Sequence, residues 1–391
     1  MDRRRRRLPS SAALAALDDD DILSEILRRL PPLPSSLPRA SLVCKRWRRL
    51  VADPHFLRRF REHHRKPPIL GFFSRLLDDV IQFTPALDSP DSIPASRFSL
   101  RLDGAKHSII LDCRHGRVLF LNRMWLYFVV WAPVTGEQCR VDFPLSFRGN
   151  NARKWWPSGA VVCAASEQGH VHGGCHSNPF QVVLVATGGH GEGVFACVYS
   201  SETCTWGNVV SVLLPQNLSA ISFCCANTLV GNSVFWFLYG RSFGVLKFDL
   251  HRQSLDAIEL PSGAIDFDIW GQAKRQFLIT PADGGGLSLL YLSGFNGQVW
   301  KWKANCDGGV GWMVGSNFDL NNLLSLKAGV DNRGPKIPGM AEDDSTMFLW
   351  TDVRVFRSHL ESMKFKKLSI IMSHSIFKVH FPFRSFYSAG T

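Results

Sequence analysis

The sequence lacks several features that would define its class at once. It has no uninterrupted apolar run of about 18 residues, so we expect no membrane span. None of its 10 cysteines forms a CxxC pair, and several lie in apolar runs, which favours reduced, packed thiols over a disulfide scaffold. The signatures of a P-loop and of a G-x-S-x-G nucleophile elbow are also absent. These absences predict a soluble protein that is not an enzyme and has no cofactor.

The chain is rich in apolar residues and unevenly charged. Its 391 residues include 12 Trp and 28 Phe, enough for a sizeable core, and the length suggests one small and one large domain. The formal net charge is +12. Residues 1–66 hold 17 Lys and Arg against 8 Asp and Glu, whereas the rest of the chain is nearly neutral. The positive charge therefore belongs to the small N-terminal domain.

Residues 1–16 are expected to be a disordered basic leader that contains five arginines, Arg3 to Arg7. A nuclear localisation patch or a contact with a polyanion are the alternative interpretations of this run.

Residues 17–66 have the pattern of a compact helical module. Asp18 to Asp21 offer capping carboxylates before apolar residues at helical spacing, and Pro31-Pro32 ends that first helix. Two further apolar stretches follow, and Asp53-Pro54 separates a last short helix from them. A module of about 50 residues buries a limited core, so its apolar faces would be better satisfied by another protein.

Two phrases in this module resemble an F-box. They are Leu17-Asp-Asp-Asp-Asp-Ile-Leu-Ser-Glu-Ile-Leu-Arg-Arg-Leu-Pro31 and Leu42-Val-Cys-Lys-Arg-Trp-Arg-Arg-Leu-Val-Ala-Asp-Pro-His-Phe56. Asp18 departs from the family, which usually has a proline there. The resemblance implies helix-in-groove binding to a Skp-family adaptor and, through it, to a cullin. By residue matching, the implied contacts are Leu17, Ile22, Ile26, Leu30, Pro31, Leu37, Val43, Cys44 and Trp47. Some of these residues could instead form the core of the module itself.

Residues 67–391 read as short β-strands separated by Gly, Asn, Asp and Ser. A faint repeat starts at Arg117, Val182, Ser233, Leu287 and Thr346, and a segment from Ile69 could add a sixth unit. Units of this kind are typical of propeller blades. The prediction is thus an α+β multidomain chain, in which a small all-α module precedes a large all-β, propeller-like domain. A β-sandwich is the alternative.

Several phrases of this domain, including Asp112-Cys-Arg-His-Gly-Arg-Val-Leu119, resemble the F-box-associated domain of plant, especially grass, F-box proteins. Together, the two resemblances imply the substrate receptor of an SCF-type ubiquitin ligase, located in the nucleus or cytoplasm, with an unknown protein target. Trp155-Trp156, beside Lys154 and Pro157, is the best candidate for an exposed target-binding patch.

The most metal-like segment is Gly169-His-Val-His-Gly-Gly-Cys-His176. Imidazoles and a thiolate can ligate zinc, but four ligands from one glycine-rich heptad would require a tight loop. We therefore expect a surface loop and no metal.

Two other functions would each account for part of the sequence. A basic nucleic-acid or chromatin-associated protein would use Arg3–Arg7 and the arginines near Trp47, but adaptor binding explains that basic face equally well, which disfavours nucleic acid. A sugar-binding propeller lectin is supported only by the abundance of aromatic residues.

Overall fold

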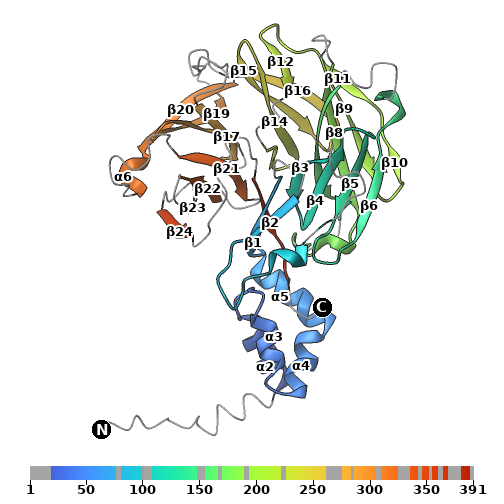
Figure 1. The fold of residues 1–391 in the computed structure, drawn as a ribbon, viewed down its shortest axis with the longest axis vertical. Helices are drawn as coiled ribbons and strands as arrows, with labels where there is room; N and C mark the ends of the chain where they lie inside the picture. The colour runs from blue at the N-terminus through green and yellow to red at the C-terminus, as the bar shows by residue number, and fades with distance from the viewer. Residues whose placement is uncertain are drawn as a thin grey trace.

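In the computed structural model, the described part of the chain begins with four helices, which precede a ring of six β-sheets (Figure 1). The structure describes residues 19–75, 81–98, 100, 108–147, 155–165, 170–188, 193–221, 226–260, 275–282, 286–304, 310–324, 335–341, 346–351, 355–359, 364–368 and 380–387. No helix within these ranges is long and apolar enough to cross a membrane.

The helical module contains α2 (Asp20–Arg28), α3 (Ser36–Ser41), α4 (Lys45–Ala52) and α5 (Pro54–His64). The Asp19 carboxylate accepts hydrogen bonds from the amides of Asp21 and Ile22, so the predicted acidic cap of the first helix is confirmed. Asp53 caps α5 in the same way through the amide of Phe56. The core of the module consists of Leu23, Leu27, Leu37, Ala40, Val51, Phe56 and Phe60.

Six blades form the propeller, which confirms the all-β prediction. Three of them are four-stranded meanders: β3 (Ser108–Arg114), β4 (Arg117–Asn122), β5 (Tyr127–Trp131) and β6 (Gln138–Asp142); β17 (Arg275–Pro281), β18 (Leu287–Ser293), β19 (Asn296–Ala304) and β20 (Val310–Asp319); and β21 (Lys336–Ala341), β22 (Thr346–Trp350), β23 (Val355–His359) and β24 (Lys364–Leu368). A fourth blade is a close variant with an additional short strand. It contains β7 (Trp156–Cys163), β8 (Phe180–Thr187), β9 (Val194–Ser200) and β10 (Thr205–Trp206), and β11 (Val210–Val212) also pairs with β9.

The other two blades depart from this pattern. In one, β12 (Leu218–Ile221) and β13 (Thr228–Val230) both pair with β14 (Ser233–Gly240), which continues through β15 (Phe243–Asp249) to β16 (Ser254–Glu259). The last blade closes the ring: β25 (His380–Arg384) pairs with β1 (Ile69–Arg75), which pairs with β2 (Ile81–Pro85). Strands from the two ends of the domain thus share one sheet.

The predicted repeat corresponds to the blades. Arg117, Ser233, Leu287 and Thr346 each begin the second strand of a blade, and Val182 lies in another such strand. The sequence repeat is irregular in length because the connections between the strands and blades differ in length.

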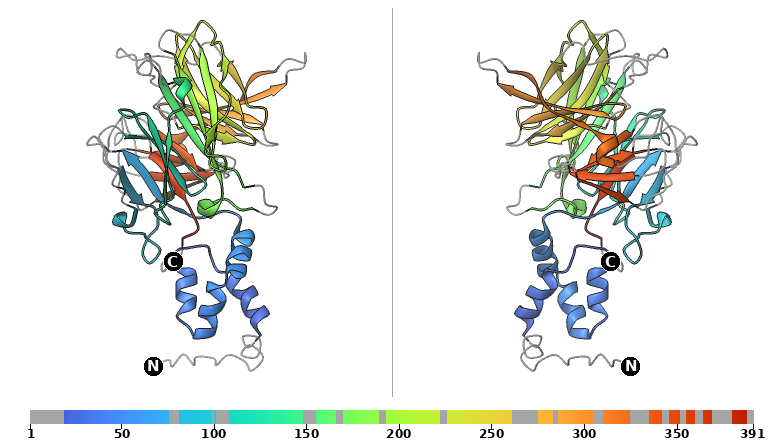
Figure 2. Two further views of the ribbon diagram at one scale, coloured as in Figure 1. Left: turned by 90° about the vertical axis from the view of Figure 1, so that its right-hand side faces the viewer. Right: turned by 90° about the vertical axis from the view of Figure 1, so that its left-hand side faces the viewer.

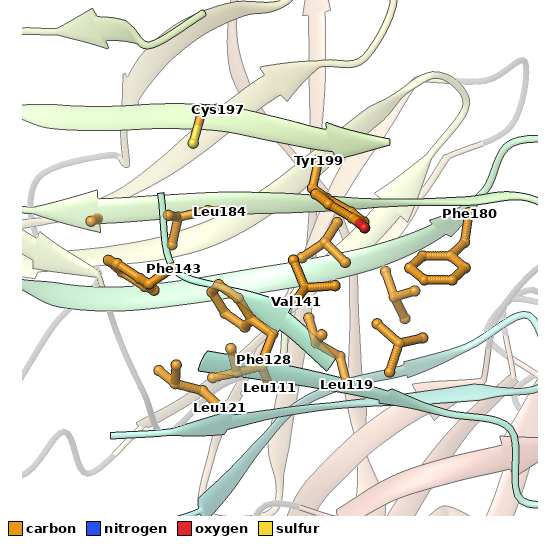
Figure 3. Packing of buried hydrophobic residues seen from close by; sticks show 14 of the residues in the cluster. Leu111, Leu119, Leu121, Phe128, Val141, Phe143, Phe180, Leu184, Cys197 and Tyr199 are labelled. Carbon is orange, nitrogen blue, oxygen red and sulfur yellow. The ribbon is translucent and has the colours of Figure 1, made fainter. Parts of the chain in front are cut away.

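Packing between neighbouring blades holds the ring together. Figure 3 shows one such layer, in which Leu119 and Phe128 of one blade meet Leu184 and Tyr199 of the next. Each fully buried side chain of this size stabilises the fold by about 1.5–3 kcal/mol.

The helical module lies at one end of the molecule, below the propeller (Figures 1 and 2). Helix α5 is next to the propeller, and α2 is farther from it. A hydrogen bond of 2.9 Å from the Ser35 amide to the Asp91 carboxylate joins the two parts. Gly174 is a second point of contact, because a Cβ placed on it would lie 3.4 Å from the Arg61 side chain.

Candidate functional site

The helical module exposes apolar side chains on helix α2. Ile22 and Ile26, four residues apart, are 44% and 42% exposed. Leu23 and Leu27, each the next residue along the chain and therefore about 100° further around the helix, are fully buried in the module. The module core therefore covers only part of the apolar side of the helix, and the strip that carries Ile22 and Ile26 remains in solvent.

A second group of exposed apolar residues lies just before α4. Leu42 and Val43 are 75% and 61% exposed, and Cys44 is exposed as well. An ion pair of 2.6 Å between Arg46 and Asp20 brings the start of α4 beside the start of α2. The two exposed groups thus belong to the same end of the module.

The predicted adaptor contacts fall into three groups. Ile22, Ile26, Pro31, Val43 and Cys44 are exposed. Leu30 and Trp47 are partly buried against the module core, and Leu37 belongs to that core. Leu17 lies outside the described residues. Leu42, the most exposed of these apolar side chains, was missed, although the sequence places it directly before Val43.

The two predicted target-binding tryptophans have different surroundings. Trp155 is partly buried, with its ring centroid 5.2 Å from those of both Phe147 and Phe195. Trp156 is 45% exposed, and the guanidinium of Arg123 lies over its ring. Only Trp156 is thus available to a partner.

Further exposed apolar side chains lie near Trp156. Met124 and Trp125 occupy the turn between β4 and β5, where both amides donate to the Asn122 side chain. The cation–π contact of the neighbouring Arg123 joins this turn to Trp156. Sequence reasoning missed both residues; a tryptophan in a short polar turn was the available signal.

The histidine-rich segment connects β7 to β8 and is not a simple surface loop. Cys175, at the start of a 3-10 helix (η5, Cys175–Ser177), is fully buried, so the expectation of an exposed loop is wrong at this residue. A 2.9 Å hydrogen bond from the Ala164 amide to the Pro179 carbonyl joins the two ends of the β7–β8 connection. The Arg117 guanidinium donates to the carbonyls of Cys175 and Asn178 and fixes the second half of the loop.

Four metal-ligating side chains meet within this connection: Cys163, His170, His172 and Cys175. Their ligand atoms all lie within 4.8 Å of one another. The set differs from the heptad considered in the sequence, because Cys163 at the end of β7 takes the place of His176. Cys163 was missed because it lies outside the glycine-rich segment. The β7–β8 hairpin brings that segment back beside Cys163, which the sequence alone does not indicate.

His115 supports this cluster from the turn between β3 and β4. Its ring stacks on that of His172, with centroids 3.8 Å apart, and its Nδ1 accepts a 2.9 Å hydrogen bond from the Cys163 amide. Burial lowers the pKa of His115 well below its ordinary value, which keeps the ring neutral and able to accept.

The two thiols of the cluster differ in acidity. A hydrogen bond from Cys175 lowers the pKa of the Cys163 thiol, and the same bond, together with burial, raises the pKa of Cys175. None of the seven cysteines that the structure describes forms a disulfide.

Comparison with known proteins identifies the helical module. Residues 19–59 match the F-box domain family. The chain therefore contains an F-box domain, followed by a six-bladed β-propeller. A search of curated protein sequences finds no match.

Solved structures with a similar arrangement include the Dos1 propeller, with 11% identity and a TM-score of 0.37; the match covers 81% of this chain and 77% of that chain. A chain of a nidogen/laminin complex has 11% identity and a TM-score of 0.36, with 78% of this chain and 93% of that chain covered. A chain of a mitotic checkpoint complex has 10% identity and a TM-score of 0.34, with 77% and 89% covered. At these scores, the likenesses carry no inference about function.

Proposed function

We propose that this protein is a non-catalytic substrate receptor of an SCF-type ubiquitin ligase. The F-box would bind a Skp-family adaptor and, through it, a cullin, while the propeller would bind the protein to be modified. The observation that carries the proposal is the exposed apolar surface of the F-box, formed by Ile22, Ile26, Leu42 and Val43. Such a surface is costly in water and is typical of a binding site for another protein.

The rest of the chain suits this role. Catalysis would come from holding a target near a charged ubiquitin-conjugating enzyme, so no reactive residue of this chain is needed. A receptor of this kind acts in the nucleus or cytoplasm. The resemblance of the propeller sequence to grass-type F-box-associated domains is consistent with the same role.

The target would bind at the propeller end that is remote from the F-box. Trp156 begins β7, and Cys163, near the F-box, ends it. Seven residues of extended chain separate them by about 23 Å at about 3.3 Å per residue. The exposed Trp125 and Met124 share the end of Trp156, which allows an adaptor and a target to bind at the same time.

The direct test is co-expression of the full chain with a Skp-family adaptor, followed by size-exclusion chromatography. We expect the two proteins to elute together. The Ile22→Asp/Ile26→Asp variant should elute alone, because binding would bury two carboxylates in an apolar groove. A folded wild-type chain that binds no Skp-family adaptor would refute the proposal.

The same material tests the nucleic-acid alternative. That function predicts binding to a DNA or RNA duplex that weakens steeply with salt and is lost when Arg3–Arg7 are deleted. Ion pairs already engage some of the basic residues of the F-box, such as Arg29 with Glu25 and Arg58 with Glu62. For this reason, we favour the adaptor.

A further inference from the structure

We propose that Cys163, His170, His172 and Cys175 bind one Zn²⁺ ion, and that this ion holds the β7–β8 connection in the shape that docks against the F-box. The site is independent of the adaptor function proposed above. It is built from this chain alone and lies where the two domains meet.

The distances fit tetrahedral zinc. His170 Nε2 lies 3.3 Å from both Cys163 Sγ and Cys175 Sγ, and His172 Nδ1 lies 3.5 Å from Cys175 Sγ. Zinc bonds of about 2.3 Å to sulfur and about 2.0 Å to nitrogen, at tetrahedral angles, place such atoms about 3.5 Å apart. Only small side-chain movements would bring all four atoms to bonding distance of a common centre.

The donor set selects the metal class. Two thiolates and two neutral imidazoles balance the charge of a divalent ion, and this combination favours zinc over the oxygen-preferring Mg²⁺ and Ca²⁺. Loading the site releases the thiol protons, because the metal binds each cysteine as a thiolate. Four protein ligands leave no open position, which indicates a structural and not a catalytic ion.

The supporting contacts orient the ligands. Stacking on His115 positions the His172 ring, and the hydrogen bond from the Cys163 amide to His115 fixes the end of β7. Arg117 holds the carbonyl of Cys175. Partners that fix the ligands in this way are a regular part of metal sites.

The connection carries the site to the domain junction. Between His172 and Cys175, the carbonyl of Gly173 accepts hydrogen bonds from the Ser385 hydroxyl at 2.8 Å and from the Phe386 amide at 3.1 Å. Gly173 also faces Pro67, in the segment between α5 and β1, and Gly174 faces Arg61 of α5. An ion that fixes the residues on either side of Gly173 and Gly174 would therefore fix the F-box relative to the propeller.

A small pocket adjoins this contact. It is lined by α5 residues Arg58, Arg61 and Glu62 and, from the connection, by His170, Val171, Gly174 and Asn178. Because His170 is both a proposed ligand and a lining residue, release of the ion would alter this junction directly.

The experiment measures metal in the full chain, purified under reducing conditions with a tag that contains no histidine. We expect mass spectrometry of the metals to find one zinc per chain. Cys163→Ser/Cys175→Ser should reduce it to background. Cys139→Ala/Cys197→Ala, which removes two thiols outside the cluster, should leave it unchanged.

A second measurement keeps the test valid if the Cys163→Ser/Cys175→Ser variant does not fold. Wild-type protein stripped with a chelator is titrated with Co²⁺. Tetrahedral cobalt bound to thiolates should give intense visible bands and a thiolate charge-transfer band, which one equivalent of Zn²⁺ abolishes. In the zinc-free protein, limited proteolysis should cut faster between α5 and β1.

Two results would overturn the proposal. The first is folded wild-type protein that binds neither zinc nor cobalt while Cys163 and Cys175 alkylate freely. The second is a Cys163–Cys175 disulfide in the peptide map of freshly purified, unreduced protein that carries no metal, which would make the pair a redox site.

Discussion

Gly173 packs against Pro67 with no room for a side chain: a Cβ on Gly173 would lie 2.4 Å from Cγ of Pro67. This contact joins the β7–β8 connection to the short segment between the F-box and the first propeller strand. The backbone at Gly173 has a φ of +99°, which a residue with a side chain rarely adopts. Both the turn and the contact thus require glycine.

Gly173→Ala should destabilise the protein more than a matched glycine change. Gly136 also has a positive φ, of +81°, but a Cβ there would meet nothing within 4 Å. Gly136→Ala should cost about 1–2 kcal/mol from backbone strain alone. Gly173→Ala adds a clash with Pro67, so its free energy of unfolding, measured in urea, should fall further. Equal losses would show that the contact with Pro67 is unimportant.

Ile26→Asp should weaken adaptor binding without unfolding the F-box. The side chain is 42% exposed in the free protein, and binding would bury the introduced charge. Loss of about 2 kcal/mol or more, roughly a 30-fold rise in Kd, is expected by calorimetry with a Skp-family adaptor. Leu213→Asp, at an 81% exposed propeller residue, is the control and should bind normally.

Leu27→Ala tests the other face of the same helix. Leu27 is 1% exposed in the F-box core, so its truncation should cost about 2–5 kcal/mol. Ile26→Ala, one residue away, should change stability by about 0.5 kcal/mol or less. Hydrogen exchange, followed separately in F-box and propeller peptides, should show the Leu27→Ala loss in the F-box. A similar loss in both variants would contradict the assigned helix faces.

Trp156→Ala and Trp125→Ala should reduce target binding and leave the propeller folded. Both side chains are exposed, whereas Trp155 packs between Phe147 and Phe195. Trp155→Ala should therefore lower the melting temperature by several degrees, at about 1–3 kcal/mol. Proximity labelling under proteasome inhibition would compare the captured proteins. Unchanged capture by the Trp156→Ala/Trp125→Ala double variant would exclude this patch.

Much of the architecture could be predicted because local pattern and tertiary packing agree. In the F-box, apolar spacing predicted the helices, and the Asp19 and Asp53 carboxylates cap two of them. In the propeller, the strongest apolar runs are the second strands of the blades, since these are covered on both faces. The repeat that began at Arg117 and Ser233 therefore followed real blades.

The sites were harder to predict because they depend on which hairpins meet. Leu37 and Ile26 are both apolar at helical spacing, yet one is core and the other surface. Cys163 ends a strand, and nothing local indicates that the following segment turns back to bring His170 onto it. Tertiary contacts such as these are not encoded in residue spacing within one element.

Closure of the ring has a consequence for how the protein is made. Gly71 pairs with Phe383, so the first blade stays incomplete until every other blade has been synthesised. The F-box precedes all of them and has its own core, so it can fold much earlier on the ribosome. Nascent or truncated chains would then carry a folded F-box beside an open propeller. Under the proposed function, such chains would occupy the ligase without delivering a target and would compete with the intact receptor.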